Sequence, residues 1–468
     1  MKKLVLSVCA LSVAGALITP KLIAGKIESN INNLVTEINA LHGYQASLTE
    51  VSPTWFNTEG VINISFDPTA LNANSASKIE GFEAKFQFSA DHGPILLNSD
   101  KFIGLMSMNV TLEDSEVREY LRWAEDKPLY NAKLYGSLLG NITYKDTIEP
   151  FNVANDEGTN ISFKGYQGNG NFSNTEWSYK GLALPLTIES ENTGNVTLGE
   201  IELDIHANAS FAQMLETSLY DSDSKINLKS LSVKDDNSNN NIELENLYIV
   251  ATSAVDKTKD VGSVGITYGL GSIDFQEFAA TDLALAIEVN NISNSFVQAY
   301  KKVESELSKG STEQVQAKLQ QFLENNLLSV LEAEPQINVT SLRGTLEEGS
   351  FESKVNTSLV GITQLPQMLE DPGFWLSHVL ADGEIVGDKA VVERIATLVM
   401  VNQLKTNPQT MGMSEAELEQ IAQQQVPQML QMFMQQGFIV ANDTSYTSKF
   451  SFKDKALTVN DKQIPLPL

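Results

Sequence analysis

The sequence predicts an α+β protein: an N-terminal membrane helix followed by an extended, mostly antiparallel β-sheet with two helical insertions. Three observations predict this fold class. An apolar run from Leu4 to Ile18 follows two lysines, short alternating segments recur from Val61 onward, and two later stretches carry apolar residues at helical spacing. Alternation with a period of two is typical of strands with one wet face, and intervals of three to four residues are typical of amphipathic helices.

The expected organisation divides the chain into consecutive parts. They are a signal-anchor or transmembrane segment at 1–24, an amphipathic helix at 25–43, an antiparallel β-rich region at 44–290, a helical hairpin at 291–335, a β-strand pair at 336–364, a helical block at 365–440 and a C-terminal β-hairpin at 441–468.

The N-terminal segment has the polarity of an export signal. Lys2 and Lys3 precede an apolar run of 15 residues, and continuing it to Ala24 reaches the ~20 residues that span a bilayer. Ala14-Gly15-Ala16 fits a small-x-small cleavage pattern but lies inside the apolar run. We therefore expect an uncleaved anchor, with a cleaved signal peptide and a cytoplasmic core helix as alternatives. Apolar residues at helical spacing then continue to Gly43.

Alternating segments dominate the following region and predict an antiparallel meander. Turn signals separate them, among them Glu80-Gly81, Asn169-Gly170 and Thr193-Gly194-Asn195. A short helix is expected around Ser115–Trp123. The segments are Val61–Phe66, Phe82–Phe88, Leu182–Ile188, Ile201–Ile205, Ile226–Val233, Ile242–Val250, Val264–Phe275, Leu283–Val289, Ile337–Leu346 and Phe351–Val360.

Capping signals delimit the helical insertions. Ser311–Gln314 and Ser414–Glu417 both read as capping boxes, and Gly437 as a C-terminal cap. Pro427 should kink or divide the last helix. Its apolar face carries Met429, Met432 and Met434, which predicts either adaptable core filling or a hydrophobic docking face.

Composition excludes several classes of function. The chain carries 59 acidic and 32 basic side chains, a net charge of −27, which disfavours nucleic acid and anionic membrane surfaces as partners. Cys9 is the only cysteine and lies in the expected membrane segment. The exported part therefore has no disulfide, thiolate nucleophile or cysteine metal site.

No residue pattern indicates a reaction. The four histidines are His42, His92, His206 and His378, and none stands at metal-ligand spacing to another. Asp221-Ser222-Asp223-Ser224 faintly resembles a calcium loop but lacks its later glycine and glutamate. We therefore assign no catalytic, cofactor-binding or metal-binding residue, and expect no cofactor and no enzymatic activity.

Several short motifs follow one another along the whole chain. They are Gly43-Tyr44, Trp55-Phe56-Asn57-Thr58-Glu59-Gly60, His92-Gly93-Pro94, Pro335–Val339 with Leu342, Thr345 and Gly349, and Leu457-Thr458-Val459-Asn460 followed by Lys462. In this order they resemble the YdgA-like family of bacterial proteins, a family of unknown function. Two motifs depart from its pattern: Thr54 stands where the family has Gly, and Asp461 stands where Gly is usual. The resemblance implies an envelope protein attached to the inner membrane and facing the periplasm.

We therefore expect a non-enzymatic, inner-membrane-anchored periplasmic protein with a scaffold or binding role. Its one-face-apolar sheet would form a hydrophobic groove for a lipid or an apolar protein segment, or a closed core. The expected partners are the membrane, a lipid or envelope protein and a second copy of the chain, but no nucleic acid. A periplasmic hydrolase whose active site is not visible in sequence is the alternative, and a surface adhesin is a weaker one.

Overall fold

A computed structural model of the chain describes most of its length. The described residues are 32, 35–36, 38–39, 43–67, 82–97, 99–113, 117–119, 121–154, 159–190, 194–210, 219–235, 241–276, 278–307, 312–369, 371–407, 410 and 412–465. The expected membrane segment at 1–24 and the capping box at Ser311 lie outside them. Within these ranges, no helix has both the length and the apolar character needed to span a membrane.

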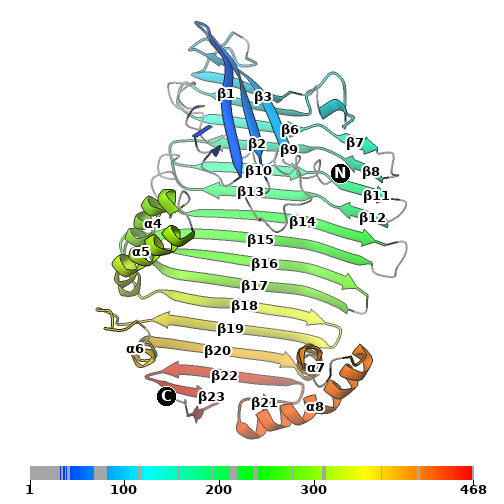
Figure 1. Cartoon of the computed structure of the whole chain (residues 1–468), viewed down its shortest axis with the longest axis vertical. Coiled ribbons are helices and arrows are strands. Elements are labelled where there is room, and N and C mark those ends of the chain that lie inside the picture. The colour runs from blue at the N-terminus through cyan, green and yellow to red at the C-terminus, as the bar shows by residue number, and fades with distance from the viewer. Residues whose placement is uncertain are drawn as a thin grey trace. The chain divides into compact units, whose positions relative to one another are not determined.

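The chain forms two compact units. Unit 1 comprises Met1–Ser238 with Gln298–Phe322, and unit 2 comprises Asn239–Val297 with Leu323–Leu468. Figure 1 shows that strands dominate both units and lie side by side within each. All the strand pairs described below are antiparallel, which confirms the expected mostly antiparallel sheet. Helices lie between some of these strands in the sequence.

Unit 1 is built on one continuous series of strand pairs. Its strands are β1 (Tyr44–Pro53), β2 (Asn57–Phe66), β3 (Phe82–His92), β4 (Met106–Leu112), β5 (Tyr130–Gly136), β6 (Ile142–Ile148), β7 (Phe151–Ala154), β8 (Thr159–Phe163), β9 (Tyr166–Phe172), β10 (Trp177–Ala183), β11 (Leu186–Ser190), β12 (Gly194–Leu198), β13 (Ile201–Ala207) and β14 (Ser222–Lys234). β1 to β6 pair in sequence order, and β6 then pairs with β9, β9 with β10, β10 with β13 and β13 with β14.

Proline and glycine interrupt four long strands of unit 1 at a common level. Pro150 separates β6 from β7, Gly165 separates β8 from β9, Pro185 separates β10 from β11, and Gly199 separates β12 from β13. Proline has no N–H to give to a ladder, and glycine tolerates strained backbone. The outer halves still pair as β7–β8, β8–β11, β11–β12 and β12–β14, so each interruption bends a strand without ending the sheet.

The large hydrophobic core lies in unit 1. Inward side chains of β2 to β6 are almost completely buried there, including Ile62, Phe86, Met108 and Leu134. They alternate with polar residues along each strand, as the sequence predicts. Burial of such side chains is the main source of stability in a chain without disulfides.

Unit 2 is a meander of long strands with helices between some of them. Its strands are β15 (Ile242–Asp256), β16 (Val261–Phe275), β17 (Phe278–Ser293), β18 (Gln336–Leu346), β19 (Gly349–Leu359), β20 (Val379–Asp388), β21 (Val440–Ala441), β22 (Ser445–Lys453), β23 (Ala456–Val459) and β24 (Lys462–Ile464). β15 to β20 pair in sequence order, followed by β20–β22, β22–β23 and β23–β24.

Helices occupy both predicted insertions. α4 (Asn294–Leu307) and α5 (Thr312–Glu332) follow β17, and the rings of Tyr300 and Phe322 meet edge-on at 5.7 Å. α6 (Pro372–His378) precedes β20, and α7 (Lys389–Thr406) and α8 (Glu415–Gln436) follow it. Val401, Leu418 and Ala422 form a small buried cluster between α7 and α8.

The helical block expected at 365–440 needs a correction, because β20 runs through it as a strand. Val379–Asp388 pairs with β19 on one side and β22 on the other. Gly383 leaves the space that the Phe450 ring occupies, and Gly387 lies against Val392 of α7. Pairing on both sides outweighs the helical pattern of the flanking residues.

Three smaller expectations are also corrected. Asn169-Gly170 is not a turn but lies inside β9, where two tyrosine rings pack over the glycine. The helix expected around Ser115–Trp123 is described only as a three-residue 3₁₀ turn at Val117–Glu119. Pro427 does not divide α8, which continues past it between the buried Val426 and Leu430.

Candidate functional site

The long strands of unit 2 carry one apolar face. Cross-strand neighbours align Ile249, Tyr268, Leu285 and Leu342 in one row across β15 to β18. A second row aligns Ala251, Ile266, Ile287, Val339 and Val355. We call this surface the apolar sheet face. Its members are Leu247, Ile249, Ala251, Val264, Ile266, Tyr268, Leu270, Leu283, Leu285, Ile287, Val289, Ile337, Val339, Leu342, Val355 and Ile385.

The apolar sheet face is open. Ile337 is 60% exposed, Ile385 49% and Tyr268 45%, and none of the sixteen members falls in the buried class. In unit 1 the corresponding inward side chains are almost fully buried. An exposed apolar surface spanning several strands is unusual for a soluble monomer and marks an interaction site.

The opposite face of the same strands is more polar, although large apolar residues such as Tyr248, Val250 and Val386 stand among its polar rows. One row across β15 to β20 reads Thr252, Gly265, Glu288, Asn338, Asn356 and Asp382. Asn356 donates to the Asp382 carboxylate at 2.9 Å, and Lys449 pairs with Glu384 at 2.9 Å. A hollow of about 610 Å³ on this face is lined mainly by polar residues of β20, β22 and β23. Water therefore solvates this face, and the sheet is amphipathic as the sequence predicts.

A buried carboxyl group lies in unit 1. Asp146 of β6 is 3% exposed and sits among tyrosines of β5, β6, β9 and β10. Tyr179 donates to its two carboxylate oxygens at 3.1 and 3.4 Å, and Tyr166 bonds to Tyr179. Tyr130 and Tyr144 lie beside it with their hydroxyls 3.5 Å apart. We call these five residues the Asp146 cluster.

Burial sets the ionisation of the Asp146 cluster. Desolvation raises the pKa of Asp146 to about 6, although hydrogen bonds from Tyr179 and Tyr144 lower it in part. Desolvation and the nearby carboxylate raise the pKa of Tyr166 to about 12, and also raise the pKa values of Tyr130 and Tyr179. Tyr130, Tyr166 and Tyr179 are therefore neutral near pH 7.

Glycines make room for the Asp146 cluster. A Cβ at Gly168 would collide with the Asp146 carboxylate and the Tyr179 hydroxyl, and one at Gly181 would lie 2.7 Å from the Tyr166 hydroxyl. Both glycines lie directly across the strands, since Asp146 pairs with Gly168 and Gly168 with Gly181. The cluster is thus specified by residues on four neighbouring strands, β5, β6, β9 and β10.

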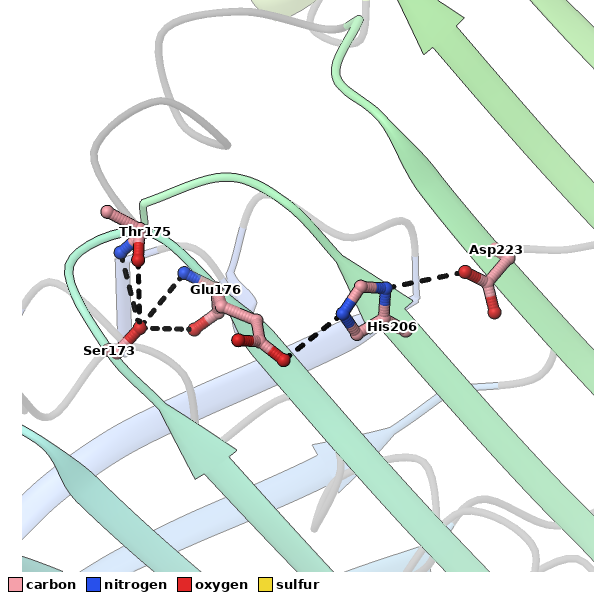
Figure 2. Close-up of polar contacts among 5 residues, drawn as sticks. All are labelled: Ser173, Thr175, Glu176, His206 and Asp223. Atoms are coloured by element: carbon pink, nitrogen blue, oxygen red, sulfur yellow. Dashed lines mark hydrogen bonds and ion pairs between the residues drawn. The ribbon is translucent and has the colours of Figure 1, made fainter.

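His206 of unit 1 lies between two carboxylates, as Figure 2 shows. Its Nε2 is 3.1 Å from Glu176 Oε1, and its Nδ1 is 3.4 Å from Asp223 Oδ1. Ser173 lies beyond Glu176, and its hydroxyl accepts from the Glu176 N–H and donates to the Glu176 carbonyl. The serine hydroxyl closes its own turn, so these residues do not form a nucleophile–histidine–acid arrangement.

The other sequence candidates that the structure describes make local contacts within the fold. His92 ends β3 and bonds to Thr58 at 3.1 Å, and a Cβ at Gly93 would collide with the backbone of Ile95. His378 bonds to the Val360 carbonyl at 2.8 Å, whereas His42 is not described. Ser222–Ser224 opens β14 instead of forming a calcium loop. The described residues contain no cluster of three or more potential metal ligands.

The methionine face of α8 is not its buried face. Leu418, Ala422, Val426 and Leu430 are buried along the helix, whereas Met432 is 45% exposed. The Ser414 capping box and the left-handed Gly437 cap are both present.

Comparison with known families identifies the family of this chain. A family model described as "Bacterial protein of unknown function (DUF945)" matches residues 1–467. The chain belongs to this family. No curated protein and no solved structure matches it.

Proposed function

We propose that this member of the family is a non-enzymatic envelope protein that holds the acyl chains of a lipid on its apolar sheet face. In this proposal, segment 1–24 anchors the chain in the inner membrane and the remainder faces the periplasm, in line with the resemblance to YdgA-like proteins. The observation that carries the proposal is the exposure of the apolar sheet face across β15 to β20.

The dimensions of this face suit acyl chains. β15, β16 and β17 have 15, 15 and 16 residues, and a strand rises ~3.3 Å per residue, so each is ~50 Å long. One acyl chain reaches about half of the ~30 Å hydrocarbon core of a bilayer. Each methylene removed from water contributes ~0.8 kcal/mol. A chain lying along the face would therefore be bound by contact area alone, without polar recognition.

The polarity of the two faces fixes where the lipid lies. Charged and amide side chains on the opposite face are paired with one another, for example Lys449 with Glu384. An apolar chain there would desolvate these groups without replacing their hydrogen bonds. The ligand is therefore confined to the apolar sheet face.

Photocrosslinking in the native membrane tests this placement. A benzophenone amino acid in place of Ile337 reports on the apolar sheet face, and one in place of the exposed Lys354 on the opposite face is the matched control. We expect an adduct of lipid mass at position 337 and none at 354, because benzophenone reacts with C–H bonds in contact with it. Equal adducts at both positions, or a protein adduct at 337, would contradict lipid binding by this face.

Lipid extraction is a second test of lipid binding by the apolar sheet face. Replacing both Ile249 and Ile337 by Asp places charge on the face, and we expect several-fold less co-purifying lipid after solvent extraction and mass spectrometry. The unaltered anchor segment gives the same background in both proteins. Unchanged recovery relative to the parent chain would count against the proposal.

A further inference from the structure

Three loops at one end of the unit 1 sheet carry a cluster of exposed large apolar side chains. They connect β1 to β2, β3 to β4 and β5 to β6, so alternating strand direction brings them to the same end. We call residues 54–56, 93–97, 99–105 and 137–141 the loop platform. Trp55 is 86% exposed and Leu139 84%, and Leu97, Phe102, Ile103 and Leu138 are each more than half exposed.

Hydrogen bonds join the three loops into one body. The His92 N–H donates to the Phe56 carbonyl at 2.9 Å, and the Leu105 N–H donates to the Gly136 carbonyl at 2.8 Å. The Tyr135 hydroxyl donates to the Ile103 carbonyl at 2.6 Å. Buried Leu96 fixes the middle loop from below. The exposed side chains are therefore presented by a shaped surface with internally bonded backbone.

The charge of the loop platform differs from that of the chain. Asp100 and Lys101 are its only charged residues, in a protein with a net charge of −27. Asp100 pairs with Lys133 at 3.3 Å, and Lys101 lies over the Tyr135 ring at 3.9 Å. The platform is thus locally neutral. The acidic excess that disfavours anionic surfaces lies elsewhere on the molecule.

We propose that the loop platform inserts into the interfacial layer of a lipid bilayer. Trp has an apolar ring and a polar N–H, which suits the headgroup level, and Phe, Leu and Ile suit the acyl layer below it. Paired backbone groups are required there, because an unpaired N–H or C=O in hydrocarbon costs several kcal/mol. The platform carries no net charge, so the headgroup layer does not repel it, while the acidic body stays in water.

This surface is separate from the apolar sheet face, which belongs to the other unit. It contacts the membrane surface, whereas the apolar sheet face is proposed to hold lipid taken out of a membrane. Either proposal can therefore fail without the other.

Quenching by brominated lipid tests the insertion. The full chain is reconstituted into phosphatidylcholine vesicles with or without bromine on the acyl chains. Subtracting the emission of Trp55→Phe from that of the parent isolates Trp55. Trp375, half-buried in α6 with its Nε1 bonded to the Leu369 carbonyl, is isolated in the same way as a control.

We expect bromination to lower the Trp55 emission about twofold and to leave that of Trp375 unchanged, because tryptophan in the interface lies within contact of the upper acyl chain. Equal Trp55 emission in the two lipids would overturn the proposal. Flotation of each variant with the vesicles measures its binding, so loss of vesicle binding cannot imitate this result.

A second variant identifies the surface responsible. Replacing both Phe102 and Leu139 by Glu charges the platform without altering a buried side chain. We expect this pair to abolish the quenching of Trp55 and to leave the melting temperature unchanged. Met368→Glu, at an equally exposed position outside the platform, should retain the quenching. Quenching that persists in the Phe102/Leu139 variant would show that the platform does not insert.

Discussion

Asp146 is buried where its charge is costly. Its pKa of about 6 in the folded chain lies above the ordinary value of 3.8, so the folded state holds the proton more tightly than the unfolded state. The neutral carboxyl is stabilising relative to the charged one. This contribution is complete below about pH 4 and is lost as the pH rises through about 6. The difference between these two pKa values corresponds to about 3 kcal/mol in the free energy of unfolding.

Replacing Asp146 by Asn should remove this pH dependence. The amide can still accept from Tyr179 but carries no charge, so we expect unit 1 to be more stable than the parent at pH 8, by up to about 3 kcal/mol, and little changed at about pH 4. Urea unfolding followed by tryptophan emission, to which the buried Trp123 contributes, measures both.

The control for this prediction is Asp204→Asn, which removes an exposed carboxylate paired with Lys180 and should change stability by under about 1 kcal/mol. A parent and an Asp146→Asn protein with parallel pH profiles would show that Asp146 is not titrating in this range.

The sequence indicates only part of the Asp146 cluster. In β6, Asp146 follows Tyr144 and precedes Ile148 at the inward positions, so an acid interrupts an apolar alternation. That pattern marks a buried polar group. Its partners Tyr166 and Tyr179 come from other strands, and only the strand register brings them together.

α8 shows how local signals fix the ends of an element. The Ser414 hydroxyl accepts from the Glu417 N–H at 3.4 Å, and the Glu417 carboxylate accepts from the Ser414 N–H at 2.8 Å. At the other end, Gly437 adopts a φ of 83°, where a side chain is disfavoured. At the first end, the N–H groups of Ser414 and Glu417 would otherwise lack partners, and the two side chains accept from them reciprocally.

Ser414→Ala should loosen the first turn of α8. Loss of an N-cap side chain typically costs ~1 kcal/mol, so we expect about fivefold faster hydrogen exchange of the amides of that turn. Glu415→Gln in the same turn breaks only the exposed pair with Lys405 and should have a smaller effect. Equal effects of the two variants would show that charge, not the cap, stabilises this end.

Element prediction succeeded where the signal is local and failed where it depends on neighbours. The amphipathic strands, the Ser414 capping box and the Gly437 cap follow from adjacent residues. Val379–Asp388 contains two glycines and reads poorly as a strand, but β19 and β22 pair with it on both sides. Asn169-Gly170 reads as a turn, but the glycine is needed where the rings of Tyr144 and Tyr179 approach the backbone. The apolar face of the sheet was predictable from alternation; its exposure was not, because alternation alone does not show what covers a face.

At the scale of the whole molecule, the buried core is unevenly distributed and the net charge is strongly negative. The large buried cluster lies in unit 1, whereas the strands of unit 2 are mostly half-buried. The excess of acidic side chains repels itself in the folded state. Exposed pairs such as Lys180–Asp204 offset little of this repulsion, because water screens them.

Salt should therefore stabilise the chain near neutral pH. Raising the ionic strength from about 0.01 to 0.15 M shortens the screening length from ~30 to ~8 Å, so we expect the melting temperature to rise by several degrees. The sequence pI is about 4.5, and at that pH the same salt change should have little effect. A salt response of the same size at both pH values would argue against self-repulsion as its cause.

The order of strand pairing in unit 2 has a consequence for how the chain acquires its structure. From β16 to β20 each strand pairs with the one that precedes it in the sequence. Short loops join β15 to β16, β16 to β17 and β18 to β19, and closing them costs little entropy and favours rapid folding. The two longer connections carry helices, α4 and α5 before β18 and α6 before β20. A chain that emerges N-terminus first, from a ribosome or a translocation pore, can add these strands one at a time onto an edge already formed. The sheet can then grow at the pace of emergence, and no long-range pairing has to wait for the C-terminus.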